Sequence, residues 1–325
     1  MRFFMLLFYT NFERKIILEQ LINLKTYPVK DVLDLLLVDK TTKKNITFAT
    51  DSYEKFGLMY KKENHITKSI LLGLNELEIQ PRIFKDLEEQ ISRTRKTAEV
   101  FTPAWVCNKM NNYCDTEWFG YPDVFNTILE ETWNTNLEKI NFPEDKSWEM
   151  YIDSKRLEIA CGEAPYIVSR YDVSSGEFIS IKDRIGILDR KLRVVNENTY
   201  NEEDWLKYVI KSFQSVYGYD YQGDNLLIAR INLLMTFVEY MEDRWNKFPT
   251  ISQLKKIANI IAWNFWQMDG LNGCVPFSGI SEVVEQISFF NIEPDIRSVN
   301  KEIFCRIYDW KANKSILFND LMKER

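Results

Sequence analysis

Short apolar strands alternate with helices from about residue 98 onward, and this order constrains the fold more than any other feature of the sequence. Helical periodicity covers residues 103–118, 203–216, 223–244 and 253–262, and the apolar strand-like segments are residues 156–160 and 216–221. Strands separated by helices are typical of a mostly parallel sheet with helices on both faces. We therefore expect an α/β fold for this part of the chain.

The first 97 residues have a different pattern. Apolar residues recur at helical spacing on both sides of Pro28, and residues 34–50 (DLLLVDKTTKKNITFAT) predict two strands joined by a polar turn. This indicates two regions: an N-terminal mixed region of helices and a β-hairpin at residues 1–97, and the α/β domain at residues 98–325. A polar, charged stretch at about residues 170–204 is expected to be an insertion in the second region.

A charged segment, residues 82–98, is expected to be a solvated helix. It carries the best local basic cluster of the chain, which consists of Arg93, Arg95 and Lys96. A solvated helix face is the simpler interpretation of this cluster. Contact with a phosphate is the alternative that stays open.

Composition argues against several classes of protein. The five cysteines are scattered without a CxxC pair and His65 is the only histidine, so we expect neither a zinc site nor a disulfide framework. The apolar start, MRFFMLLFYT, is too short to span a bilayer and lacks the layout of a signal peptide. We therefore expect a cytoplasmic protein with no metal site and no membrane contact.

The strand at residues 156–160 runs directly into a turn with the features of a cofactor site. Glu158 lies near the end of this strand, and the small residues Gly162 and Ala164 follow it closely. Small residues let a cofactor approach the backbone, and the carboxylate can accept hydrogen bonds from an ammonium group. An ordinary strand and turn with a capping glutamate would look similar, so both interpretations stay open.

A second predicted strand, at residues 216–221, also has an acidic residue near its end. Asp220 is placed where an acidic side chain at the end of a second strand can hold the ribose hydroxyls of a nucleoside. The alternative is that Asp220 or Asp224 caps the helix that follows.

The segment Glu99–Val106 (EVFTPAWV) opens a helix. Its N-terminus, after Thr102 and Pro103, would attract an anion such as a carboxylate. The alternative is that Thr102 is a simple helix cap.

Taken in this order, Phe101-Thr102-Pro103, the segment LEIACGEA at residues 157–164 and the strand ending in Asp220 resemble adenine-specific DNA methyltransferases, the modification subunits of restriction–modification systems. The resemblance covers roughly residues 98–325, and RTRKTAEVFTPAWVCN, LDRKLRVVNENT and NFWQMDGL add to it. It implies a Rossmann-like methyltransferase core that binds S-adenosyl-L-methionine.

The resemblance also implies roles for individual side chains. The methionine end of the cofactor would contact Phe101, Thr102 and Pro103. The loop beneath the cofactor would consist of Glu158, Ala160, Cys161 and Gly162. Asp220 would bind the ribose, and Tyr221 would lie beside the adenine ring. Asp269 is the implied partner of the adenine amine, and Asp309 is the alternative for that role.

The sequence departs from the family pattern at several positions. Glu158 stands where the family usually has Asp, and Ala164 where it usually has Gly. The family reaction also needs an Asn/Asp-Pro-Pro-Tyr/Phe loop, which accepts hydrogen bonds from the target amine and stacks on the flipped base. No Pro-Pro dipeptide occurs in the 325 residues, so the catalytic residues are unassigned; the sequence ends at FNDLMKER, about where that loop would follow.

The resulting expectation is a modification subunit for adenine methylation of double-stranded DNA, in a restriction–modification or phage-defence system, that takes the missing loop from a partner chain. The net charge of −6 favours a partner, because phosphate contacts normally require a basic excess. The main alternative is a non-catalytic binding or regulatory module with the same fold. A nuclease is disfavoured, because Asp34, Asp39 and Lys40 lack the acidic-x-Lys spacing that such a site requires.

Overall fold

Three parallel strands form the central sheet in a computed structural model of the chain, which describes residues 21–74, 76–97, 99–279 and 301–323. The strands are β3 (Arg156–Ile159), β4 (Val216–Asp220) and β5 (Phe265–Gln267). Their order is β3-β4-β5, with Leu157 opposite Tyr217 and Gly218 opposite Phe265. The expected α/β class and the two expected strands are confirmed.

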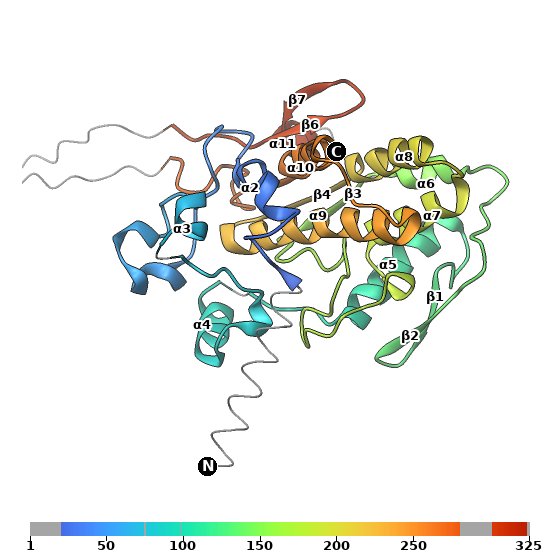
Figure 1. Cartoon of the computed structure of the whole chain (residues 1–325), viewed down its shortest axis with the longest axis horizontal. Coiled ribbons are helices and arrows are strands. Elements are labelled where there is room, and N and C mark those ends of the chain that lie inside the picture. Colours follow the sequence, from blue (N-terminus) through green and yellow to red (C-terminus); the bar gives the residue numbers. More distant parts are fainter. Residues whose placement is uncertain (1–20, 75, 98, 280–300, 324–325) are drawn as a thin grey trace, which may run out of the picture.

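Long helices make the connections between these strands. Helices α7 (Ile187–Asn198) and α8 (Glu202–Gln214) lie between β3 and β4 in sequence, and α9 (Gly223–Trp245) and α10 (Ile251–Asn264) lie between β4 and β5. Figure 1 shows α9 running through the middle of the molecule. Every residue of α9 from Gly223 to Leu234 is buried, as expected of a helix that is covered on all sides.

The two faces of the sheet are covered differently. Because side chains alternate along a strand, Val216 and Phe265 enter the main core with residues of α7 to α10, whereas Tyr217 and Trp266 enter a small second cluster. That cluster is completed from β6 (Arg306–Asp309), β7 (Lys314–Leu317) and α11 (Phe318–Lys323). In the described residues, long helices therefore cover one face, and the other face carries the β6–β7 hairpin and the short α11. The predicted cover of helices on both faces is confirmed for one face only.

The N-terminal region consists of short helices and turns. Its elements are α2 (Val29–Leu37), α3 (Lys68–Leu72), α4 (Leu87–Thr97) and the 3-10 helices Asp51–Phe56, Leu58–Tyr60 and Arg82–Phe84. The first strand predicted at residues 34–50 is wrong, because Val32, Leu33 and Leu36 recur at helical spacing and are buried in the main core. Of the predicted hairpin, one bridge between Val38 and Asn45 is present.

Helix α9 joins this N-terminal region to the sheet. The buried guanidinium of Arg230 donates hydrogen bonds to the carbonyl oxygens of Leu36, in α2, and Phe265, in β5. At the start of α9, a Cβ on Gly223 would lie 1.8 Å from the carbonyl oxygen of Thr47, so only glycine permits this approach. The main core runs from α2 to α10 without interruption, and the division of the chain after residue 97 stays a prediction.

The helix expected at residues 103–118 is α5 (Ala104–Phe119), and it precedes the hairpin of β1 (Asn126–Leu129) and β2 (Thr132–Thr135) and the short helix α6 (Trp148–Asp153). The stretch at about residues 170–204, expected to be an insertion, contains α7. Its apolar side chains belong to the main core, and its charged Arg190 is buried in an ion pair with Asp115. The polar composition of this stretch therefore does not mean that it is exposed.

Among the described helices, none combines the length and the apolar character needed to cross a lipid bilayer.

Candidate functional site

A pocket of about 400 Å³ lies at the carboxyl edge of the sheet, where β3 and β4 end. Parallel strands bring their carboxyl ends to one edge, and open α/β sheets bind ligands in the crevice there. Eight residues predicted from the sequence line this pocket: Phe101, Thr102, Glu158, Ala160, Cys161, Gly162, Asp220 and Tyr221. The structure therefore brings together segments that lie more than a hundred residues apart in the chain.

The turn after β3 has an unusual backbone. Ala160, Gly162 and Ala164 have φ values of 48°, 54° and 63°, in the left-handed region that residues other than glycine seldom occupy. Each alanine there carries a cost of about 1 kcal/mol. Such strain persists only where the surroundings fix the backbone, and it is common where a ligand approaches closely.

Asp220 is one of the groups that fix this turn. Its two carboxylate oxygens accept hydrogen bonds from the backbone amides of Gly162 and Gln222, each at 2.8 Å. Burial raises the pKa of Asp220 to about 6, although both hydrogen bonds act in the opposite direction. A carboxylate has about four acceptor positions, so the side chain can still accept bonds from a ligand.

Glu158, near the end of β3, is a second buried carboxyl group of the pocket. Its Oε1 accepts a long hydrogen bond from the amide of Tyr166, at 3.4 Å, while its Oε2 has no hydrogen-bond partner. Burial raises the pKa of Glu158 well above its usual value, and the charge of Asp220 adds to this. A buried carboxylate oxygen without a donor is costly, so a ligand donor at this place would be stabilising.

Sequence reasoning missed two further carboxylates of the pocket, Glu99 and Glu163. Glu163 accepts hydrogen bonds from the amide of Arg82 and the hydroxyl of Tyr171, so both of its oxygens are used. Glu99 accepts a bond from Arg93 Nε at 2.7 Å through one oxygen, and its other oxygen has no hydrogen-bond partner. For Glu163, its position directly after Gly162 in the turn was a signal that could have been used.

The lining of the pocket is rich in carboxyl groups. Four carboxylates, those of Glu99, Glu158, Glu163 and Asp220, line it, and its described lining includes no lysine and no arginine. No group of three or more His, Cys, Asp or Glu side chains in the described residues is placed to hold a metal ion. The arrangement therefore suits an organic cation that also donates hydrogen bonds.

The N-terminus of α5 was expected to attract an anion from a ligand. It already has one from the protein, because the amide of Ala104 donates to Asp172 Oδ2 at 2.9 Å. Pro103 is the residue that precedes the helix, and it does not line the pocket; Thr102 lines the pocket and does not cap the helix. The prediction of a ligand anion at this helix end is therefore wrong for its first amide.

Asp269 lies at the same edge of the sheet but does not line the pocket. It follows β5, and its carboxylate accepts bonds from the amide of Leu271 and the side chain of Asn272. Burial raises the pKa of Tyr221, and the charge of Asp269 adds to this. Asp309, the alternative, closes the β6–β7 turn by accepting from two backbone amides there.

Two other open questions from the sequence are answered by contacts. Asp224 does not act as the side-chain cap of α9, because it forms ion pairs with Lys85 and Arg93 inside the protein. Arg93 is therefore buried in an ion pair and belongs neither to a solvated face nor to a phosphate site.

Burial raises the pKa of Cys161 well above its usual value, so this thiol is not an activated nucleophile.

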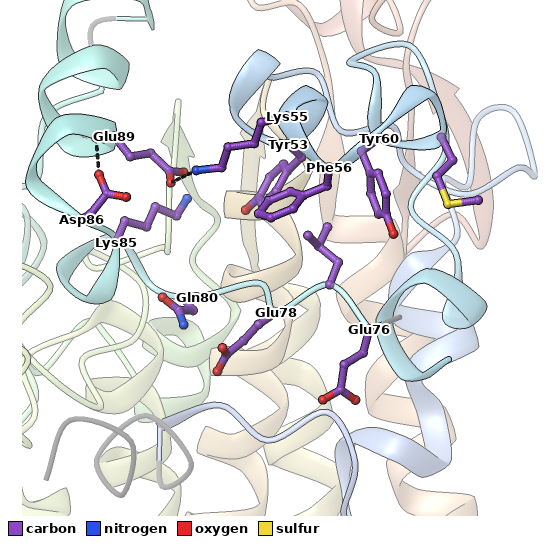
Figure 2. Close-up of a pocket in the computed structure, with 12 residues that line it drawn as sticks. Tyr53, Lys55, Phe56, Tyr60, Glu76, Glu78, Gln80, Lys85, Asp86 and Glu89 are labelled. Atoms are coloured by element: carbon purple, nitrogen blue, oxygen red, sulfur yellow. Dashed lines mark hydrogen bonds and ion pairs between the residues drawn. The ribbon is translucent and has the colours of Figure 1, made fainter. Parts of the chain in front are cut away.

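A larger hollow, of about 640 Å³, lies in the N-terminal region (Figure 2). Figure 2 shows the rings of Tyr53, Phe56 and Tyr60 in this hollow, and Lys55 pointing toward Glu89, 4.0 Å away. No buried polar atom without a hydrogen-bond partner is found among the described residues that line it. The smaller pocket, which has two such atoms, is the better candidate for a ligand site.

The described chain is thus a mixed α/β protein with a carboxylate-lined pocket at the carboxyl edge of a parallel sheet. Comparison of the chain with protein-family models, with curated proteins and with solved structures finds no match.

Proposed function

We propose that the pocket binds S-adenosyl-L-methionine and that the chain is the cofactor-binding subunit for adenine methylation of DNA in a restriction–modification or phage-defence system. The proposal includes a Rossmann-like methyltransferase core, of which β3, β4 and β5 would be three adjacent strands. The sequence resemblance suggests this function. Physical support comes from the charge and the free acceptors of the pocket.

The observation that carries the proposal is the kind of ionisable side chain in the lining. Four carboxylates and no basic side chain in the described lining favour a cation and repel phosphate groups. S-adenosylmethionine carries a sulfonium and an ammonium group, whereas dinucleotides and nucleoside triphosphates carry several negative charges. Among nucleoside-containing cofactors, the lining therefore favours the sulfonium compound.

The hydrogen-bonding capacity of the pocket also fits this ligand. Glu158 Oε2, buried and without a donor, would accept from the ammonium group of the cofactor. Asp220 would accept from the ribose hydroxyls with the capacity that its two backbone donors leave free. Tyr221, which is 39% exposed, would offer its ring to the adenine.

The cofactor supplies the methyl group, and this chain would bind and orient it for direct displacement by the target amine. The groups that polarise that amine are expected from a partner chain. Exposed apolar side chains are available beside the pocket, since Leu157 and Ile159 of β3 are 45% and 66% exposed. Apolar surface next to a site is typical of a place where another chain packs.

Calorimetric titration of the purified chain tests the proposed ligand. S-adenosylmethionine should bind, and ATP and NAD should not. The variants Asp220→Ala and Glu158→Gln should each weaken binding about tenfold or more, because each removes a buried carboxyl acceptor. Glu203→Gln, on the exposed side of α8, is the matched control and should leave the affinity unchanged. Binding of ATP in preference to S-adenosylmethionine would contradict the proposal.

A second candidate is a non-catalytic module that keeps the cofactor pocket for a regulatory purpose. The absence of a Pro-Pro dipeptide and the net charge of −6 favour it. A methyl-transfer assay on double-stranded DNA separates the two, with the product of the neighbouring gene added to the chain. Cofactor binding without any transfer in that mixture would select the non-catalytic module.

A further inference from the structure

Glu99 is a pocket carboxylate for which neither the sequence nor the proposed function gives a role. It lies between α4 and α5 and is 8% exposed. Its Oε2 accepts from Arg93 Nε at 2.7 Å and from Asn225 Nδ2 at 3.2 Å. Its Oε1 is buried without a hydrogen-bond partner, with Arg82 Nη1 at 3.9 Å.

A buried ion cluster holds Glu99 in this orientation. Arg93 donates to both oxygens of Asp224, at 2.9 and 3.1 Å, and Lys85 donates to Asp224 at 2.8 Å. Arg93 is therefore fixed at its far end, and through Nε it fixes one oxygen of Glu99. The other oxygen has no hydrogen-bond partner in the protein, and Glu99 lines the pocket. An acceptor that the protein already holds in place binds a ligand at little further entropic cost, which is the usual advantage of a preorganised site.

The unused oxygen needs a donor that the protein does not supply. Leaving a buried carboxylate oxygen without a hydrogen bond is unfavourable, and a positively charged donor relieves this most. An ammonium group has three donors, so it can serve two carboxylates at once. The segment that carries Glu99 continues directly into Phe101 and Thr102, which also line the pocket.

We infer that Glu99, held by Arg93, is a second acceptor for the amino-acid ammonium of the cofactor. It would act together with Glu158, which comes from a different segment of the chain. This inference rests on the proposed function, because it assumes a ligand with an amino-acid group. Glu99 is then a binding residue and Arg93 is a positioning residue. The ribose hydroxyls are the competing donors, and the experiment has to separate them from the ammonium.

Two ligands separate the amino-acid group from the nucleoside. S-adenosylhomocysteine has both, with a neutral sulfur, and 5′-methylthioadenosine lacks the amino-acid group. For the full chain, Glu99→Gln should weaken S-adenosylhomocysteine about tenfold to a hundredfold and leave the affinity for 5′-methylthioadenosine unchanged. Glu163→Gln is the matched control in the same pocket, because both oxygens of Glu163 already have protein donors. It should not discriminate between the two ligands.

The outcomes are distinct. Selective loss of S-adenosylhomocysteine binding supports the inference, and intact binding of 5′-methylthioadenosine shows at the same time that the variant is folded. An equal loss for both ligands, or no loss for either, overturns the role of Glu99 while the proposed cofactor stands. If the unaltered chain binds neither S-adenosylmethionine nor either of these two ligands, the proposed function fails, and the inference fails with it. If it binds S-adenosylmethionine but not S-adenosylhomocysteine, the inference alone is overturned, because the amino-acid group then contributes too little to binding.

Discussion

Asp220 Oδ2 accepts a hydrogen bond from the backbone amide of Gly162, with 2.8 Å between the two atoms. The bond connects the end of β4 to the turn after β3, across 58 residues of sequence. Because the bond joins the acidic side chain to the strained turn, a substitution at either residue should alter the position of the other.

Asp220 should make cofactor binding depend on pH. Because burial raises its pKa to about 6, the carboxyl is mostly ionised at pH 7.5 and mostly protonated at pH 5. Ribose hydroxyls donate to the ionised form, so the affinity for S-adenosylhomocysteine should fall as the pH decreases through about 6. Calorimetric titrations between pH 5 and pH 8 would measure this.

The control for this pH profile is Asp220→Asn, which cannot ionise. Its affinity should be lower at pH 7.5 and should change less below pH 7. The pKa of Glu158 is raised as well, so some pH dependence from that residue remains in the variant. Equal affinity of the unaltered chain at pH 7.5 and pH 5 would rule out an ionised Asp220 as the acceptor.

Gly162→Ala should affect binding more than folding. A Cβ at this position meets no atom within 4 Å, but the φ of 54° costs an alanine about 1 kcal/mol. Because Gly162 lines the pocket, the added methyl group would occupy space that a ligand uses. We expect a small decrease in the free energy of unfolding and a clear loss of affinity, measured by denaturation and calorimetry.

Gly120→Ala is the matched control for this substitution. Gly120 follows α5 with a φ of 83°, a Cβ there also meets nothing within 4 Å, and it does not line the pocket. It should show a similar loss of stability without a loss of affinity. If both variants bind the ligand normally, Gly162 does not face the bound ligand.

The sequence predicted those parts of the site that have a local signature. Glu158, Gly162 and Asp220 could be found because an acid or a small residue at the end of an apolar strand is visible in a few neighbouring positions. The structure adds that the strands are adjacent and parallel, which brings those positions into one pocket.

The parts that were missed depend on distant partners. Arg93 was expected at the surface because charged residues are seldom buried, but its partner Asp224 is 131 residues away in the sequence. The cap of α5 by Asp172 spans 68 residues in the same way. Neither pairing can be read from the sequence of one segment, and Glu99 was missed because its orientation depends on Arg93.

Arg93→Leu should destabilise the protein by about 3 to 5 kcal/mol, because it removes one of two cations from the buried Asp224. Arg95→Leu, on the exposed side of α4, is the control and should change stability by less than about 0.5 kcal/mol. Denaturant unfolding would measure both. A variant with both Arg93→Leu and Asp224→Asn should recover part of the loss.

The same ion pairs predict the direction of the pH dependence of stability. The pKa of Asp224 lies well below its usual value, because Arg93 and Lys85 outweigh the effect of burial. A depressed pKa means that the stabilisation is complete above the unfolded-state value, about 3.9, and is lost as the pH falls below it. The stability difference between Arg93→Leu and the unaltered chain should therefore be constant from pH 5 to pH 7 and should shrink in stronger acid.

Arg230→Lys should loosen the N-terminal region from the sheet. Arg230 donates to carbonyl oxygens of α2 and of β5, and burial lowers its pKa to about 10, so it is still charged at neutral pH. A lysine has a single nitrogen and cannot reach both groups of carbonyls, so at least one buried carbonyl would lose its donor, at about 1 to 3 kcal/mol. Arg244→Lys is the control on the same helix, where one exposed guanidinium donates to Thr199. Urea denaturation should show the difference between the two variants; equal stability would mean that Arg230 is not what holds α2 against the end of α10 and β5.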